Sequence, residues 1–127
     1  MKLIPAIDLM NGKCVRLYRG DFNKRKDFSK EPFEQAQYWE SEGAECIHIV
    51  DLDAAKSGLP KNDQLIKEIA KNINIPIQIG GGIRSQERIE QLFSYGIDKV
   101  IMGTSAIENK ELVKDFLNRD EQVLFFL

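Results

Sequence analysis

The segment Ile75–Ser85, with the sequence IPIQIGGGIRS, changes character twice over a short distance. It begins as an almost continuous apolar run, which favours a strand that is buried on both faces. Three consecutive glycines, Gly80–Gly82, then mark a tight turn, and Ser85 can cap the helical pattern that follows. The segment therefore predicts a strand, a turn and a helix in succession, the unit from which parallel sheets are built.

The same succession repeats along the chain. Short apolar runs predict five strands, at residues 3–7, 46–50, 75–79, 100–102 and 122–127. Stripes of apolar residues at helical spacing predict helices between them, at residues 33–43, 62–72, 85–96 and from about 109 onward. Gly43 and Gly96 suit the ends of two of these helices. Four β/α units and a fifth strand build either a doubly wound open sheet or part of an eightfold barrel.

The strand ends decide between these two folds. Polar or glycine-rich turns follow four of the strands, at Asp8, at Asp51 and Asp53, at 80–84 and at 103–105. A doubly wound sheet concentrates functional groups at one switch point, whereas the rim of a barrel collects them from many strands. The sequence therefore favours the α/β class and the (β/α)8 TIM barrel, with the first half of a barrel forming one domain over residues 1–127.

Composition limits the partners of the protein. The chain has 18 Lys and Arg against 20 Asp and Glu, a formal net charge of -2, so it has no overall attraction to nucleic acid. Its two cysteines lack the spacing of a metal or redox pair, and no apolar stretch approaches the length of a membrane span or a signal-peptide core. We expect a soluble cytoplasmic protein that binds neither nucleic acid nor a membrane and has no metal site.

Two turns predict a phosphate site. The backbone N–H groups of Gly81 and Gly82 can approach an anion closely, although a tight turn with positive φ explains three glycines equally well. The turn after the next strand, Gly103–Ser105, offers two hydroxyls and further N–H groups, and Arg84 can add a charged contact. Because adjacent parallel strands end at the same edge, we expect the two turns to hold one phosphate together.

Asp8 follows the buried run IPAI, and two interpretations of it stay open. A carboxylate at the end of a buried strand, facing a phosphate-binding rim, is well placed for proton transfer. Alternatively, Asp8 caps the turn Asn11–Gly12 of a hairpin that leads into the segment CVRLY. Residues 18–28, which include the basic run 24–26, are expected to form a solvated loop or a mobile lid.

Four segments, in order IPAIDLMNGKCVRLYRGD, IHIVDLDAAKSG, IPIQIGGGIRS and VIMGTSAI, resemble the phosphoribosylformimino-5-aminoimidazole carboxamide ribotide isomerases of histidine biosynthesis. The resemblance spans the chain. It implies a (β/α)8 barrel that carries out an Amadori rearrangement, in which an aminoaldose becomes an aminoketose. The implied substrate is a ribotide with a phosphate at each end, and the implied reaction uses neither a metal nor an organic cofactor.

The resemblance also implies roles for individual residues. Asp8 is the acid–base residue of the first strand, Arg16 and Gly20 lie in the first loop near the substrate, and Asp51 is a substrate-binding residue at the rim. One of the two phosphates is held by the turns that contain Gly81, Gly82, Arg84, Gly103, Thr104 and Ser105.

Two related enzymes are the alternatives within the superfamily. The imidazole glycerol phosphate synthase cyclase typically carries Cys-Leu-Asp in the first strand and a catalytic Lys after the hairpin, where this chain has Ala6-Ile7-Asp8 and Val15-Arg16-Leu17. The isomerase is therefore favoured. A bifunctional isomerase that also acts on phosphoribosylanthranilate fits the same motifs.

The chain has 127 residues, whereas a full barrel usually needs at least about 200. In the family that it resembles, a second catalytic Asp follows the fifth strand, and that strand ends here at Leu127. We therefore expect a truncated first half of a barrel, in which Asp8 lacks its partner. Self-association through exposed half-barrel edges is one way to supply a partner. A phosphate-binding module without turnover is the non-enzyme alternative.

Overall fold

The computed structural model describes the backbone of residues 3–18, 21–27, 30–103, 111, 114 and 123–125, and the side chains of residues 3–16, 30–103, 111 and 114. Three predicted site residues, Gly20, Thr104 and Ser105, lie outside the described residues. Most of the helix expected from about residue 109 also lies outside them.

In the described part of the chain, one sheet has the strand order β3-β2-β1-β4-β5-β6-β7. Its strands are β1 (Ala6–Met10), β2 (Lys13–Tyr18), β3 (Asp21–Asp27), β4 (Ile47–Asp51), β5 (Ile77–Gly80), β6 (Lys99–Met102) and β7 (Val123–Phe125). The described helices are α1 (Pro32–Ser41), α2 (Leu52–Ser57), α3 (Asp63–Asn72) and α4 (Gln86–Ser94). None of these helices is both long enough and apolar enough to cross a membrane.

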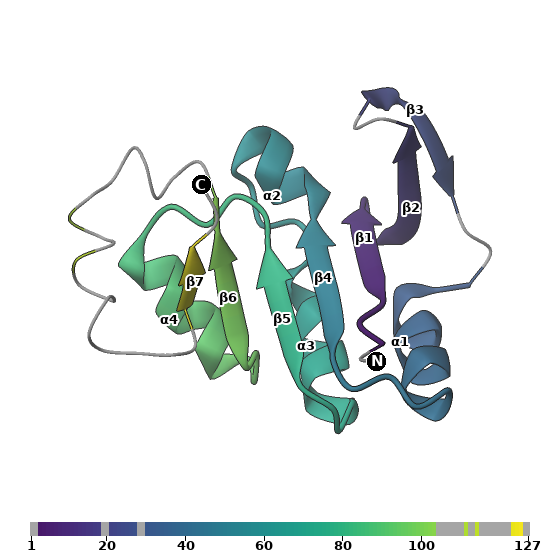
Figure 1. Ribbon diagram of the computed structural model, residues 1–127. Helices are drawn as coiled ribbons and strands as arrows, with labels where there is room; N and C mark the ends of the chain where they lie inside the picture. Colours follow the sequence, from purple (N-terminus) through teal and green to yellow (C-terminus); the bar gives the residue numbers. More distant parts are fainter. Residues whose placement is uncertain are drawn as a thin grey trace.

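The strand order identifies the winding of the sheet. Strands β1, β4, β5, β6 and β7 are parallel neighbours and follow the order of the chain without reversal. A doubly wound sheet reverses at a switch point, whereas right-handed crossovers that all advance in one direction put their helices on one face. Figure 1 shows α3 and α4 on the same face, behind the sheet. The expected barrel-type winding is therefore confirmed.

The core lies between that face of the sheet and the helices. Alternate strand residues supply one side of it, namely Ile7, Leu9, Ile47, Ile49, Ile77, Ile79, Val100 and Met102. The predicted helical stripes supply the other side through Ala36, Ile66, Ile69, Ile89 and Leu92. All of these side chains are buried, so the predicted inward faces of α1, α3 and α4 are correct.

The opposite face of the sheet carries two rows of residues, set by the strand register. One row is Asp8, Val50, Gly80 and Ile101, and the next is Ala6, His48, Gln78 and Lys99. The described helices α1, α3 and α4 do not pack on this face, and we call it the uncovered face. Leu52 of α2 packs only against one end of it, on Met10, Val15 and Val50. The prediction of strands buried on both faces is therefore wrong for β4–β6, because His48, Val50, Gln78 and Ile101 on this face are only half-buried and Lys99 is exposed.

Two further expectations need correction. The first strand is Ala6–Met10 rather than residues 3–7, because antiparallel pairing with β2 extends it past Asp8 to Met10. The segment 18–28 contains β3 instead of being a loop throughout, since Asp21–Asp27 pairs with β2 from Val15 to Tyr18. Figure 1 places this ribbon beside β1 at one edge of the sheet.

Candidate functional site

Asp8 lies in the middle of β1 on the uncovered face. Its opposite neighbours in the register are Val15 on β2 and Val50 on β4. Burial in this apolar setting raises the pKa of Asp8, and the nearby His48 partly opposes that shift. A carboxyl group with a raised pKa holds its proton closer to neutral pH, which suits a group that must both give and take a proton.

Asp8 does not cap the hairpin turn. The N–H of Asn11 donates to Asp53 Oδ2 at 2.7 Å, and the N–H of Gly12 donates to Asn62 Oδ1 at 2.9 Å. The predicted hairpin is therefore present, but side chains from α2 and from the residue before α3 hold its turn. The interpretation of Asp8 as the residue that caps this turn is therefore not supported.

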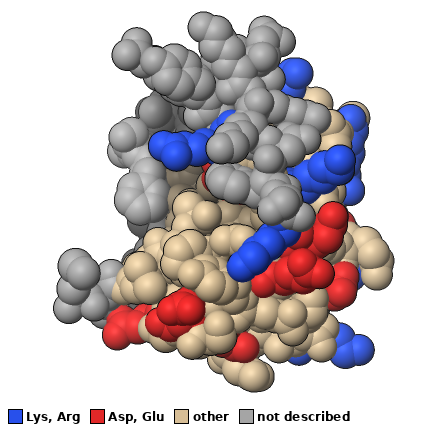
Figure 2. All heavy atoms as spheres, turned by 90° about the vertical axis from the view of Figure 1, so that its right-hand side faces the viewer, with Lys and Arg blue, Asp and Glu red and all other residues tan. Residues whose placement is uncertain are grey.

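A cavity of about 330 Å³ runs beside Asp8 at the edge of β1. Arg16 of β2 and Gln35 and Trp39 of α1 also line it, and Arg16 is exposed. Figure 2, which looks at this edge, shows Lys and Arg side chains mostly in the upper half and Asp and Glu side chains mostly in the lower half. The upper half corresponds to the carboxyl ends of the parallel strands, so the positive charge lies on the side of the predicted site.

A second cavity, of about 230 Å³, lies where β5 and β6 end. Gly81, Gly82, Arg84 and Gly103 line it, together with Ala55, Ile83 and Ile101. The structure thus brings together the described parts of the two turns that were expected to hold one phosphate. Gly80 is in the same row as Asp8, two strands away, so the turn begins about 10 Å from Asp8 at the usual strand spacing.

Gly81 and Gly82 are also required by the packing of the backbone. Their φ angles are +113° and +66°, and a Cβ atom would overlap the carbonyl of Asp51 at Gly81 and the carbonyl of Ala54 at Gly82. The turn after β5 therefore lies directly against the end of β4 and the first turn of α2. Both explanations of these glycines remain compatible with the structure, because a close backbone approach also leaves room for an anion.

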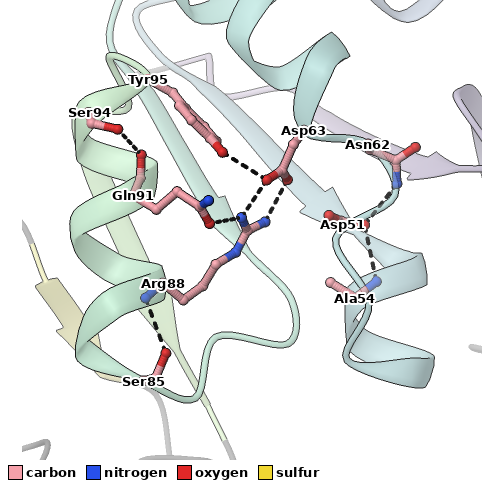
Figure 3. Close-up of polar contacts among 9 residues, drawn as sticks. All are labelled: Asp51, Ala54, Asn62, Asp63, Ser85, Arg88, Gln91, Ser94 and Tyr95. Atoms are coloured by element: carbon pink, nitrogen blue, oxygen red, sulfur yellow. Dashed lines mark hydrogen bonds and ion pairs between the residues drawn. The ribbon is translucent and has the colours of Figure 1, made fainter.

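Asp51, the last residue of β4, lies apart from the cavity at Asp8. It is opposite Leu9 in the register, so it is on the helix side, and it is only 1% exposed. Its Oδ1 accepts hydrogen bonds from Ala54 N–H at 3.1 Å and Asn62 Nδ2 at 2.9 Å, whereas its Oδ2 is buried with no partner among the described residues (Figure 3). Burial raises its pKa despite these hydrogen bonds. The structure does not bring Asp51 together with Asp8.

A neighbouring cluster joins α3 to α4 (Figure 3). Arg88 donates two hydrogen bonds to the carboxylate of Asp63, at 2.7 and 2.8 Å, and Tyr95 Oη donates a third at 3.0 Å. Burial by itself would raise the pKa of Asp63, but these hydrogen bonds and the charge of Arg88 hold that pKa below its usual range. The described side chains include no group of three or more His, Cys, Asp or Glu residues that could hold a metal ion.

Comparison with known proteins gives a consistent result. The family model described as histidine biosynthesis protein matches residues 2–125. An isomerase of Prochlorococcus marinus strain MIT 9301 is 83% identical over 119 residues, which are 94% of this chain and 47% of that protein. The corresponding protein of strain MIT 9515 is 84% identical over 115 residues, or 91% of this chain and 45% of its own length.

A more distant relative, from Synechococcus sp. strain CC9311, is 55% identical over 119 residues, which are 94% of this chain and 46% of that protein. All three are named 1-(5-phosphoribosyl)-5-((5-phosphoribosylamino)methylideneamino) imidazole-4-carboxamide isomerase. The chain spans about half the length of the curated relatives that it matches. Since the family match covers nearly all of the chain and the family is built on the TIM barrel, whose winding this sheet has, the chain belongs to the histidine biosynthesis protein family.

Proposed function

We propose that this chain supplies the first half of the active site of an aldose–ketose isomerase in histidine biosynthesis. The proposed substrate is the ribotide with a phosphate at each end that the names of its relatives imply. The observation that carries the proposal is the position of Asp8, on the uncovered face and in the same row as the start of the glycine turn after β5. A reacting carbon beside Asp8 and a phosphate at that turn fit one substrate molecule.

The proposed role of Asp8 follows from the reaction. The rearrangement opens the sugar ring and moves a proton from a carbon atom, so it needs a group that exchanges protons next to the sugar. Asp8 can protonate the ring oxygen as the ring opens, or remove the carbon-bound proton, because burial keeps its pKa above the usual range of a carboxyl group. Arg16, exposed beside the same cavity, is proposed to contact the substrate.

One phosphate is proposed to bind in the cavity at the ends of β5 and β6. Gly81, Gly82 and Gly103 would offer backbone N–H groups there, and Arg84 would offer positive charge. Thr104 and Ser105 remain predicted contributors. The implied role of Asp51 in substrate binding is not part of this proposal, because its carboxylate is 1% exposed and is already hydrogen-bonded within the protein.

The second candidate function is phosphate binding without turnover. The observation that favours it is the composition of the uncovered face. Asp8 is the one carboxylate that the parallel strands β1, β4, β5 and β6 place on this face, whereas the reaction implied by the resemblance uses a pair of catalytic aspartates. Self-association, or chain beyond these residues, would have to supply that group.

The test is a chimera in which this chain replaces the matching residues of the Prochlorococcus marinus MIT 9301 isomerase, assayed beside the 127-residue chain. We expect the chimera to isomerise the ribotide, and Asp8→Asn to lower kcat about a thousandfold. Glu45→Gln, an exposed carboxylate at the other end of β4, is the matched control and should leave turnover unchanged. An inactive chimera would contradict the proposal.

Two further readouts separate the candidates. Where Asp8 acts as the base, it must be deprotonated, so its raised pKa should place the acid limb of the kcat/KM profile above the usual carboxyl range. Arg84→Gln should raise KM about tenfold with a smaller change in kcat. If the chimera is active but the 127-residue chain binds the ribotide without turnover, phosphate binding is the function of the 127-residue chain by itself. Assay of phosphoribosylanthranilate shows whether the enzyme is bifunctional.

A further inference from the structure

Asn62 is a buried polar residue with an unusual use of its side chain. It occupies the N-cap position of α3 and is 2% exposed. An asparagine at this position ordinarily accepts a hydrogen bond from its own helix. Asn62 makes no such bond with α3. Its carboxamide is therefore used for contacts outside its helix.

These contacts join three separate segments. Asn62 Oδ1 accepts the hydrogen bond from Gly12 N–H at 2.9 Å, and its Nδ2 donates to Asp51 Oδ1 and to Asp53 Oδ2, both at 2.9 Å. Asp53 Oδ2 also accepts the hydrogen bond from Asn11 N–H at 2.7 Å. The two N–H groups at the tip of the β1–β2 hairpin are thus held by side chains that lie more than 40 residues further along the chain.

The hairpin needs such a support. Asn11 and Gly12 have φ angles of 51° and 75°, the pattern of a two-residue type I′ turn. Strand pairing between β1 and β2 runs only from Asp8 to Met10, which is short for fixing the direction of a two-stranded ribbon. Asn62 and Asp53 tie the tip of this ribbon to the rigid β4–α3 region.

We propose that Asn62 is a positioning residue, whose carboxamide fixes the β1–β2 hairpin and thereby sets the place of Arg16 relative to Asp8. The hydrogen-bonding part of this inference stands on the described contacts, and its effect on catalysis rests on the proposed function. Because Asn62 lines neither cavity, it acts through the segments that it holds, which are the hairpin and the start of α2.

Amide hydrogen exchange of the 127-residue chain tests the contacts directly. Asn11 is exposed, so its amide would exchange quickly without a partner. We expect the amides of Asn11 and Gly12 to be protected as strongly as those of β1. Exchange of these two amides at the rate of an unstructured peptide would overturn the proposal without any substitution.

Asn62→Ala removes the support. We expect the amide of Gly12, and to a smaller extent that of Asn11, to exchange at least about tenfold faster, while Leu92 in α4 stays protected and shows that the fold is intact. Asn72→Ala is the matched control on the same helix, because Asn72 is exposed and donates only to the carbonyl of Glu68. Unchanged exchange at Gly12 in folded Asn62→Ala would contradict the proposal.

Asn62→Asp provides a second test with a pH signature. It keeps an acceptor for Gly12 but places a third carboxylate against Asp51 and Asp53, while Arg88, whose charge acts on Asp51, is already paired with Asp63. Lowering the pH protonates the introduced carboxyl group, which then regains a hydrogen-bond donor. The protection factor of Gly12 should therefore be low at neutral pH and rise as the pH falls, whereas a protection factor equal to that of the unsubstituted chain at every pH would refute the role of the Nδ2 donor.

Kinetics of the chimera separate positioning from simple structural damage. A displaced Arg16 weakens substrate binding. Asn62→Ala should therefore raise KM about tenfold, with a much smaller decrease in kcat. Loss of folded molecules lowers kcat and leaves KM unchanged, and that result would contradict a positioning role. If the unsubstituted chimera has no turnover, the proposed function fails, whereas the exchange results still decide the role of Asn62.

Discussion

At the scale of single residues, the buried Asp51 and the partly buried Asp63 have opposite electrostatic roles. Asp63 has three hydrogen bonds from Arg88 and Tyr95, and its pKa lies below the usual range. Asp51 has one oxygen with no partner among the described residues, and its pKa lies above that range. The first carboxylate therefore stabilises the fold when it is charged, and the second destabilises it.

Asp51→Asn should raise the free energy of unfolding at neutral pH, on the order of 1 kcal/mol, because it removes a buried charge and keeps the oxygen that accepts two hydrogen bonds. A raised folded-state pKa gives stability that is present at low pH and is lost as the pH rises through that pKa. The gain should therefore vanish in acid. Urea unfolding across pH measures it, with Glu45→Gln as the exposed control, and a loss of stability at neutral pH would contradict this account.

Arg88→Gln should have the opposite pH dependence. It removes a charged, two-hydrogen-bond partner of Asp63, so we expect a loss of about 2 kcal/mol at neutral pH. The depressed pKa of Asp63 gives stability that is lost as the pH falls through that pKa. The variant and the parent should therefore converge in acid. Equal destabilisation at all pH values would mean that packing, not charge, accounts for the effect of Arg88.

At the scale of elements, the glycine turn after β5 packs so closely against the end of β4 and the start of α2 that it leaves no room for a side chain. Gly81→Ala should destabilise the protein by about 3 kcal/mol, because its Cβ would overlap the carbonyl of Asp51. Gly43→Ala is the matched control, since Gly43 also has a positive φ but has open space around it, and it should cost only about 1 kcal/mol. Chemical denaturation measures both. If both substitutions lowered the free energy of unfolding equally, the close backbone contact at Gly81 would not explain its loss of stability.

The sequence predicts the elements with strong apolar patterns and misses those without one. The stripes of α1, α3 and α4 and the cap at Ser85, which accepts a hydrogen bond from Arg88 N–H, are confirmed. The short helix α2 has too few residues to show a period, although Asp51 before it and Gly58 after it are a recognisable cap and stop. The charged segment of β3 has no apolar alternation, and its pairing with β2 decides its conformation.

The candidate site is predictable where the functional group follows a strand and unpredictable where distant segments meet. The positions of Asp8 and the glycine turn in the β/α units predict that they belong to the site. The structure places Asp8 and Gly80, where that turn begins, in the same row of the uncovered face. Asn62 was predicted only as the start of a helix, because nothing in the neighbouring residues indicates a contact with Gly12. Contacts of this kind depend on the packing of three loops, which local patterns do not encode.

At the scale of the whole molecule, the two faces of the sheet differ in what packs against them. One face is filled by the helices, whereas the uncovered face carries half-buried Val50 and Ile101 beside polar residues. Unpaired edges and partly apolar faces favour association with another sheet. We therefore expect the purified chain to self-associate.

Sedimentation velocity over a wide range of concentration should show this association. Ile101→Lys, on the uncovered face, should weaken it, because a charged side chain would have to be buried at the contact. Leu59→Lys is the matched control, since Leu59 is 55% exposed in the segment between α2 and α3 and belongs to no strand of the sheet. A monomer at every concentration, with one sharp unfolding transition, would contradict the expectation.

The hairpin turn also has a consequence for the chemical lifetime of the protein. Asparagine followed by glycine is the pair most prone to spontaneous deamidation, because the glycine nitrogen attacks the asparagine side chain and ammonia leaves. Here that nitrogen belongs to Gly12, and its hydrogen is held by the carboxamide of Asn62. The left-handed conformation of Asn11 is likewise fixed. Asn11 should therefore resist deamidation in the folded protein. In the unfolded chain, Asn11 should deamidate before the other asparagines.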